Sequence, residues 1–307
     1  MVFRFRAGTF NFEHGGWHDG NTRLDLDPLI DTISEAVPHV LFLQECRRWR
    51  DDGGAILRRV ARQLSDLLPD GDKYIPYLGR RGSDRNPPAI LVSCQTVEVD
   101  RWYDPSDSFM SEWHRNFLKA EIAGHEVWLA SLHWHGGHGD AEFERQASIL
   151  AQMAARPTLV GGDFNCTGSG PREPARDWTV IAEFEPQKLI QKMNHDAATG
   201  TWVTRTWPLD MLIGPWNPDT QQRAYWAGFY DVGEQGELDP QGQPVTTLTP
   251  TVNDKIDAGG SIRIDRLLAT KRFPGLLVPG SYQVHIPKDT QRLPSDHRYV
   301  TATFDLN

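Results

Sequence analysis

The chain has 307 residues, of which 39% are hydrophobic and 24% charged, as is typical of a globular protein. Its 11 Trp, 13 Phe and 7 Tyr argue against a disordered chain, and its apolar runs fall short of the roughly 20 residues of a membrane span. The net charge of -9 argues against a protein that coats nucleic acid through bulk charge.

Short apolar runs of β-strand character alternate with helical patterns along the chain. Strands are predicted at 3–12, 40–44, 89–93, 126–132, 158–161, 262–270 and 299–304. Helices are predicted at 27–37, 55–68 and 141–155. Residues 171–260, rich in Trp, Pro, Gly and Gln, are predicted to form long loops within a single domain spanning 1–307. Helices lie between strands, so we expect an α+β or α/β sandwich.

The cysteines and the N-terminus bear on location. Cys46, Cys94 and Cys166 match no metal-binding spacing and form no even set for disulfides, which favours a reducing compartment. The first residues contain no apolar stretch of the secretory type. We therefore expect a cytoplasmic protein, and the sequence leaves its oligomeric state open.

Polar side chains stand where the predicted strands stop. They are Asn11, Glu13, Glu45, His133, Asp163, Asn165, Asp265, Asp296 and His297. Because strand side chains alternate between faces, Asn11 and Glu13 share a face, as do Asp163 and Asn165. A single strand-end Asp or Asn usually caps a turn or a helix. Six such strand ends in one chain instead indicate a common cleft at a sheet edge.

The chemistry of this set is restricted. Carboxylates with an amide oxygen suit a hard cation such as Mg²⁺, and a histidine beside a carboxylate can act as a base or stabilise charge. No Cys or Ser is placed as an obvious nucleophile, so water is the expected attacker. The set therefore predicts metal-assisted hydrolysis of a phosphate ester.

The same residues, in this order, resemble the endonuclease/exonuclease/phosphatase superfamily, whose members are similar to deoxyribonuclease I. The matching motifs are Thr9–Glu13, Leu43–Glu45, Ser131–His133, Gly162–Asn165, Arg263–Leu268 and Ser295–His297. They extend over nearly the whole chain. The resemblance implies a four-layer α/β/β/α sandwich of two packed mixed sheets flanked by helices, with the active site at one edge.

The resemblance also implies a metal site. Glu45 would be the principal ligand of Mg²⁺ or Mn²⁺, with Asn11 and Asp296 close to the metal. Glu13 stands where some relatives carry an Asp, so it is a candidate ligand for a second metal. One or two divalent ions are therefore expected.

Catalytic roles follow from the same resemblance. Asp163 would orient or deprotonate the attacking water, and Asn165 would hold the phosphate. His297, with its tautomer fixed by Asp265, would contact the scissile phosphate, and His133 would be a second histidine on that side. Either Asp163 or the Asp265–His297 pair would be the base.

Candidate substrate-binding residues lie beside these motifs. Arg47 and Arg48 directly follow Glu45, and Arg115 with Asn116 precedes the strand that leads to His133. A guanidinium fits phosphate oxygens bidentately, although a solvated, salt-bridged surface is an equally available interpretation of such arginines.

The run after His133 contains Trp134, His135 and His138. Trp134 can stack on a base or pack in the core, and the two histidines can touch substrate or lie in solvent. The run also resembles the His-x-His-x-Asp-His motif of metallo-β-lactamase-like zinc hydrolases, with Gly137 in place of the Asp and His195 or His285 as further ligands. That alternative leaves Glu45, Asp163 and Asp296 unexplained.

The substrate is predicted only as a class. A phosphodiester in a nuclease-like reaction is expected first. A nucleotide, a sugar phosphate or a specialised metabolite, cleaved by a small-molecule phosphatase or phosphodiesterase, is the alternative. A non-catalytic binding protein with this fold is a third possibility, and the intact polar set argues against it.

Overall fold

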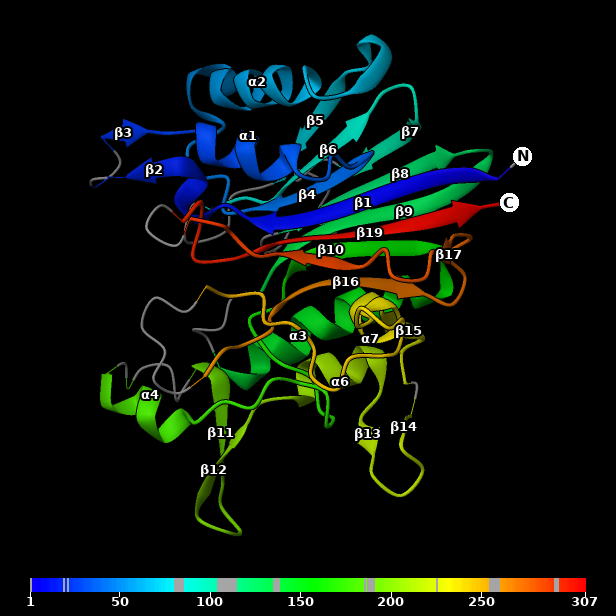
Figure 1. Cartoon of the computed structure of the whole chain (residues 1–307). Helices are drawn as coiled ribbons and strands as arrows, with labels where there is room; N and C mark the ends of the chain where they lie inside the picture. Colours follow the sequence, from blue (N-terminus) through cyan, green and yellow to red (C-terminus); the bar gives the residue numbers. More distant parts are fainter. Residues whose placement is uncertain are drawn as a thin grey trace.

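The computed structural model describes residues 2–307 except 19, 21, 80–85, 104–114, 135–138, 185, 187–190, 225, 254–259 and 290–292. Two large mixed sheets form its centre (Figure 1). The strands of the first are β1 (Phe3–Asn11), β4 (Val40–Gln44), β5 (Tyr74–Leu78), β6 (Ala89–Ser93), β17 (Leu276–Leu277), β18 (Gln283–His285) and β19 (Tyr299–Leu306). The strands of the second are β7 (Val97–Tyr103), β8 (Arg115–Ile122), β9 (His125–His133), β10 (Thr158–Asp163), β15 (Phe229–Asp231) and β16 (Asp265–Thr270).

Each sheet combines parallel and antiparallel neighbours. Within the described residues, the first sheet has the order β17-β19-β1-β4-β6-β5, with β18 also paired to β19, and the second has the order β15-β16-β10-β9-β8-β7. β1 is parallel to β4 and β9 is parallel to β10, whereas the other pairs are antiparallel. Because parallel strands end at the same edge, these two pairs bring four strand ends to one side of the sandwich.

Helices cover the two outer faces. They are α1 (Asp27–Ser34), α2 (Asp51–Ser65), α3 (Asp140–Ala151), α4 (Trp178–Phe184), α6 (Trp207–Ile213) and α7 (Val232–Gly236). α1 and α2 lie over the first sheet, and α3 and α6 lie over the second (Figure 1). The short hairpins are β2 (Trp17–His18) with β3 (Arg23–Leu24), β11 (Met193–Asp196) with β12 (Thr201–Thr204), and β13 (Trp216–Asn217) with β14 (Gln222–Arg223). Among the described helices, none is long and apolar enough to cross a membrane.

Three apolar layers hold the sandwich together. Phe42, Leu129 and Phe304 belong to the layer between the sheets, where side chains of both inner faces interdigitate. At Gly161 a side chain would collide with the ring of Phe42, so glycine allows the two sheets to approach closely there. A separate apolar cluster joins each sheet to its helices. Ile33 of α1, for example, belongs to the cluster over the first sheet. The predicted four-layer α/β/β/α sandwich is therefore confirmed.

Several element boundaries differ from the sequence prediction. β5, β7 and β8 were not predicted, because their polar and apolar residues are mixed and β5 and β7 form sheet edges. The strand predicted from residue 262 begins at Asp265, the first residue paired with β10, because Ile262 before it bonds to the backbone of the Thr251 loop. The segment 171–260 contains α4, α6, α7 and the strands from β11 to β15, and two of its hairpins project from the sandwich (Figure 1).

Candidate active site

The candidate active site lies at the edge where β1 and β4 end, on the side of the sandwich away from the chain termini (Figure 1). Asn11 is the last residue of β1, and Glu45 directly follows β4. In the second sheet, Asp163 is paired in register with His133 of β9 on one side and with Asp265 of β16 on the other. Pairing between strands thus brings together residues that are far apart in the sequence.

Asp163 is central to this cluster and is 2% exposed. Its Oδ2 accepts hydrogen bonds from Asn11 Nδ2 at 3.1 Å and from Asn165 Nδ2 at 3.3 Å, and its Oδ1 accepts one from the Asn165 backbone at 2.8 Å. Two histidine nitrogens flank the same Oδ2, His133 Nε2 at 3.6 Å and His297 Nε2 at 3.9 Å. Asp163 Oδ2 therefore faces Asn11, His133 and His297 together.

His297 and Asp265 form a buried pair. His297 Nδ1 lies 2.8 Å from Asp265 Oδ2, and the same imidazole reaches Asp296 Oδ1 with Nε2 at 3.6 Å. Burial alone would lower the pKa of His297, but the Asp265 and Asp296 carboxylates outweigh it and raise this pKa well above its usual range. The imidazole is therefore held as a cation, oriented by Asp265, beside Asp163.

Glu45 is held in a left-handed backbone conformation, with φ of 58°. Its Oε2 accepts hydrogen bonds from the His14 backbone at 3.0 Å and from Asn86 Nδ2 at 3.2 Å, while its Oε1 lies 3.9 Å from His133 Nε2. Burial opposes ionisation, yet the hydrogen bonds from His14 and the nearby His133 hold the pKa of Glu45 well below its usual range. Glu45 is therefore an anion aimed into the cluster.

Asn11 supplies an amide oxygen that the described protein atoms leave unsatisfied. Its Nδ2 donates to Asp163 and lies 3.4 Å from His297 Nε2, so Oδ1 points the other way and is buried without a hydrogen-bond partner. Turning the amide over would bring Oδ1 to 3.1 Å from the Asp163 carboxylate, a closer contact than the 3.4 Å to His297 Nε2, so this orientation is favoured. A buried oxygen without a donor fits a cation ligand.

The set of oxygens suits a hard divalent cation. Glu45 provides a carboxylate, Asn11 an amide oxygen, and Asp296 a carboxylate whose side chain is 47% exposed. Among the described residues, groups of His, Cys, Asp and Glu close enough to hold a metal are Asp163 with Asp265 and His297, and Glu173 with Asp231 and Glu234. The first group lies within this cluster but contains neither Glu45 nor Asp296.

Ser295, a motif residue to which the sequence assigned no role, and two residues outside every motif position the His297 loop. Ser295 Oγ donates to the Asn11 carbonyl at 2.7 Å and accepts from the backbone N–H of His297 at 3.1 Å. Thr251 Oγ1 accepts from the backbone of Asp265 at 2.9 Å, and Asn253 Nδ2 donates to the carbonyl of His297 at 3.1 Å. Thr251 and Asn253 belong to the segment without a family motif, so only a structure reveals their positioning role.

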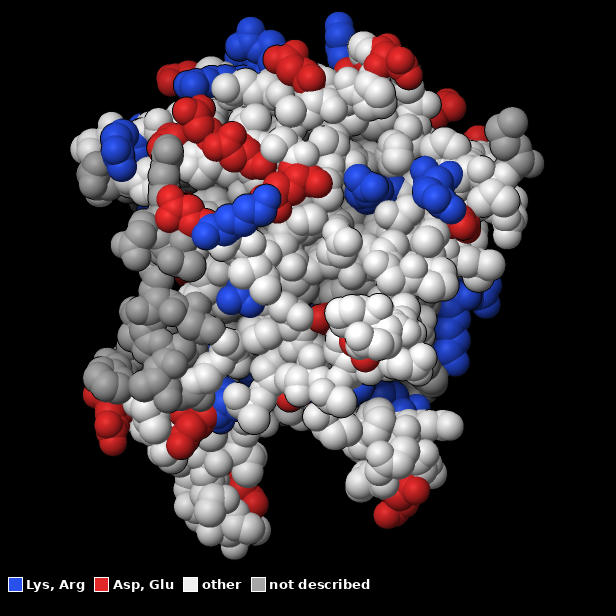
Figure 2. Space-filling view, in the orientation of Figure 1, with Lys and Arg blue, Asp and Glu red and all other residues white. Residues whose placement is uncertain are grey.

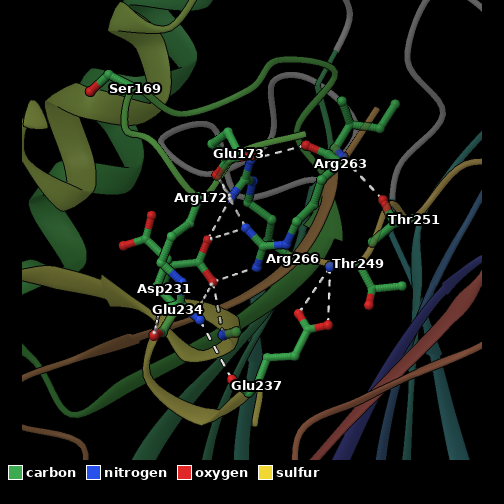
Figure 3. A network of polar contacts seen from close by, with 12 residues as sticks. Ser169, Arg172, Glu173, Asp231, Glu234, Glu237, Thr249, Thr251, Arg263 and Arg266 are labelled. Atoms are coloured by element: carbon green, nitrogen blue, oxygen red, sulfur yellow. Dashed lines mark hydrogen bonds and ion pairs between the residues drawn. The ribbon is translucent and has the colours of Figure 1, made fainter. Parts of the chain in front are cut away.

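A buried cluster of arginines and carboxylates fixes the residues on either side of Asp265 (Figure 3). Arg263 donates to Asp231 at 2.8 and 2.7 Å, and Arg266 donates to Asp231 at 2.6 Å and to Glu173 at 2.8 and 3.0 Å. Both arginine side chains are fully buried. The carboxylates of Asp231 and Glu173 are therefore paired with these two arginines. This buried cluster anchors the start of β16.

The predicted substrate-binding residues after Glu45 lie in different surroundings. Arg47 Nε donates to Asn86 Oδ1 at 3.0 Å, and Asn86 in turn contacts Glu45, so Arg47 borders the site. Arg48 donates to Asp51 at 3.1 Å and lies 4.3 Å from the ring centre of Trp17. A single bridging residue, Asn86, therefore links Arg47 to Glu45.

The candidates around His133 are mostly structural or outside the described residues. Asn116 is buried and bonds to the Tyr77 carbonyl and to Trp102, which ties the two sheets together. Trp134 is 1% exposed and packs edge-on against Phe164, so its ring lies in the core. His135 and His138 fall outside the described residues, as does the Arg115 side chain.

Three further residues named from the sequence are placed by their contacts. Glu13 donates its backbone N–H to Ser295 Oγ at 3.3 Å, which puts residue 13 beside the His297 loop. His195 lies on β11 against Trp202, and His285 lies on β18 near Glu35. These contacts give the last two histidines surroundings other than the cluster around Asp163.

The fold is that of the deoxyribonuclease I-like phosphoesterases. Residues 8–297 match the model of the Endonuclease/Exonuclease/phosphatase family, so the chain belongs to this family, whose members hydrolyse phosphate esters and generally use divalent metals. The match encloses all six motifs, and the resemblance inferred from them is confirmed. Among curated proteins, a search finds no match.

Solved structures with the same fold cover the whole chain. Truncated TDP2 from Caenorhabditis elegans is 18% identical, with a TM-score of 0.54 over 98% of this chain and 97% of that one. An endonuclease/exonuclease/phosphatase from Bacteroides vulgatus is 15% identical, with a TM-score of 0.60 over 99% and 100%. ANGEL2, a 2',3'-cyclic phosphatase, is 15% identical, with a TM-score of 0.59 over 99% and 96%. At these identities the likeness concerns the fold.

Proposed function

We propose that the chain is a Mg²⁺- or Mn²⁺-dependent phosphoesterase that hydrolyses a phosphodiester by in-line attack of water. One observation carries this proposal. A continuous series of contacts of 3.6 to 3.9 Å runs from Glu45 through His133, Asp163 and His297 to Asp296, at a single sheet edge. Such a series of anionic and imidazole groups suits the developing charges of phosphate hydrolysis.

The metal would be held by Glu45, Asn11 and Asp296. Because the pKa of Glu45 is low, this ligand is anionic. Asn11 Oδ1, which is buried without a hydrogen-bond donor, is the neutral oxygen that would bind such an ion. When bound, a divalent ion would polarise a phosphoryl oxygen and stabilise the leaving oxyanion. Glu13, whose backbone lies beside the same loop, is the proposed ligand for a second ion.

The protein's own groups would handle the water and the phosphate. Asp163 would orient the attacking water and accept its proton, because its carboxylate is fixed by Asn11 and Asn165 and faces both imidazoles. His297, kept cationic by Asp265, would stabilise charge on the phosphate oxygens together with His133. The catalytic groups thus divide into a base side and a charge-stabilising side.

The surface charge bears on the size of the substrate. On the face shown in Figure 2, acidic and basic residues are interspersed among the described residues, and the chain has a net charge of -9. A protein that grips long double-stranded nucleic acid through its backbone needs a band of positive charge. The net charge therefore supports a nucleotide-sized or single-stranded phosphodiester, with a phosphorylated metabolite as the second candidate.

A substrate panel tests the proposal. The full chain is assayed with Mg²⁺, with Mn²⁺ and with a chelator on plasmid DNA, single-stranded DNA, RNA, a 2',3'-cyclic nucleotide, bis-p-nitrophenyl phosphate and p-nitrophenyl phosphate. We expect metal-dependent release of product from diesters, faster than from the monoester. Equal rates with the chelator, or no hydrolysis of any ester, would contradict the proposal.

A further inference from the structure

A buried lysine outside every family motif reaches the candidate active site. Lys192 is 9% exposed, and its Nζ donates to the backbone carbonyl of Asn165 at 3.0 Å and also to Asn165 Oδ1. Burying an ammonium group opposes folding unless oxygen atoms replace the lost water. Two of those oxygens belong to Asn165, the residue expected to hold the phosphate.

Asn165 needs such support because its conformation is uncommon. Its φ of 51° lies in the left-handed region, which is strained for residues other than glycine and is less costly for Asn. Its Nδ2 donates to the Trp134 carbonyl at 2.7 Å and to Asp163 Oδ2 at 3.3 Å. With Lys192 engaging Oδ1, the amide cannot turn over, so Nδ2 stays on the side of Asp163.

Lys192 itself is held by a second buried cation. Arg205 is 5% exposed, and it donates its backbone N–H to the Lys192 carbonyl at 2.8 Å and its side chain to the Gln191 carbonyl at 2.6 Å. Arg205 also donates to Asn194 Oδ1 at 2.8 Å, at the start of the β11–β12 hairpin. The base of this hairpin is thereby locked next to the site.

We infer that Lys192 is a positioning residue that holds the Asn165 amide nitrogen between Asp163 and the Trp134 carbonyl, and so sets how tightly the site binds the phosphate of its substrate. This inference rests on the proposed function, because it assigns Asn165 to phosphate. It makes the base of the β11–β12 hairpin, from the segment without a family motif, part of the phosphate site. The ammonium charge beside Asn165 also favours an anion there.

A double-mutant cycle tests the inference. We would measure binding of inorganic phosphate by phosphorus NMR in the presence of Mg²⁺, and hydrolysis of bis-p-nitrophenyl phosphate, for the full chain and for Lys192→Met, Asn165→Ala and the double variant. Lys192→Gln, which keeps a polar side chain in the buried position, is the second variant if Lys192→Met folds poorly. Lys119→Met, on β8 in a surface pair with Asp100, is the matched control.

We expect Lys192→Met and Lys192→Gln each to weaken phosphate binding by about 10- to 100-fold, the usual range for losing a hydrogen bond to a charged group. The double variant should bind no more weakly than the worse single variant, because Lys192 acts through Asn165. A purely structural lysine would instead give losses that add. The Lys119→Met control should bind phosphate as the unmodified chain does.

Several results would overturn the inference: unchanged binding in both Lys192 variants, additive losses in the cycle, or no phosphate binding by the unmodified chain. The proposed function is tested separately by turnover. Phosphate binding that depends on Lys192 without hydrolysis of any ester would support the inference and contradict the proposed function. Metal-dependent hydrolysis with normal phosphate binding in the Lys192 variants would do the reverse.

Discussion

Replacing Asp231 with Asn is expected to destabilise the fold strongly. Asp231 is 1% exposed, and its two carboxylate oxygens accept hydrogen bonds from Arg263 and Arg266 and from the N–H of Gly233, where it caps α7 (Figure 3). Arg263 and Arg266 hold the pKa of Asp231 well below its usual range, because their attraction outweighs the burial that would raise it.

The magnitude follows from the charges that remain. The substitution removes one of two carboxylates facing two fully buried guanidinium groups, and it turns an NH₂ group toward their N–H donors. Breaking a buried ion pair by removing one partner costs about 3–5 kcal/mol, because the other charge is left uncompensated. At about 2–4 °C per kcal/mol for large domains, the unfolding midpoint should fall by roughly 10 °C.

The assay is urea unfolding followed by circular dichroism, with thermal unfolding as a second measurement. Asp305→Asn is the matched control, because Asp305 pairs with Arg4 at the surface and exposed pairs contribute little. A loss below about 1 kcal/mol for Asp231→Asn would refute the reasoning, since that size is typical of an exposed pair and not of a buried network.

Two further predictions concern other parts of the fold. Thr251→Val should cost about 1–3 kcal/mol, because the Thr251 hydroxyl accepts from the buried N–H groups of Ile264 and Asp265; Thr251→Ser, which keeps the hydroxyl, should retain most of the stability measured by urea unfolding. His39 accepts a hydrogen bond from the Arg6 backbone at 2.9 Å, and burial lowers the pKa of His39 below its usual 6.5. Because the folded chain resists protonation of His39, this residue contributes stability above pH 6.5 that is lost as the pH falls toward its folded pKa. His39→Asn should therefore flatten this part of the curve of unfolding free energy against pH. An unchanged curve would contradict this assignment.

The occurrence of polar residues at strand ends predicted from the sequence that these side chains would cluster. Asn11, Asp163 and His133 each end an apolar run, and the parallel pairing of β1 with β4 and of β9 with β10 brings those ends to one edge. The position of polar residues at strand ends was therefore enough to group residues that lie more than 100 positions apart. The cluster could be predicted although β7 and β8 were not, because none of its central residues lies on those two strands.

The remaining contributions could not be predicted, because they depend on loops and on partners distant in the sequence. Lys192 and Thr251 lie in the segment without a family motif, and nothing in their neighbourhood distinguishes them from surface residues. Arg263 and Arg266 look like ordinary charged residues of a strand, yet both are fully buried, each in an ion pair with Asp231 or Glu173. For Trp134 the sequence left stacking on a base and packing in the core open, and the structure shows packing in the core.

The division of labour between metal ligand and base is the central claim, and one paired titration tests it most directly. Mn²⁺ binding and hydrolysis of bis-p-nitrophenyl phosphate are measured side by side for the unmodified chain, Glu45→Gln and Asp163→Asn. Glu45→Gln should lose both Mn²⁺ affinity and turnover, whereas Asp163→Asn should keep its Mn²⁺ affinity and lose about 10²- to 10⁴-fold in turnover. Unchanged Mn²⁺ binding in Glu45→Gln, or normal turnover in Asp163→Asn, would contradict the account.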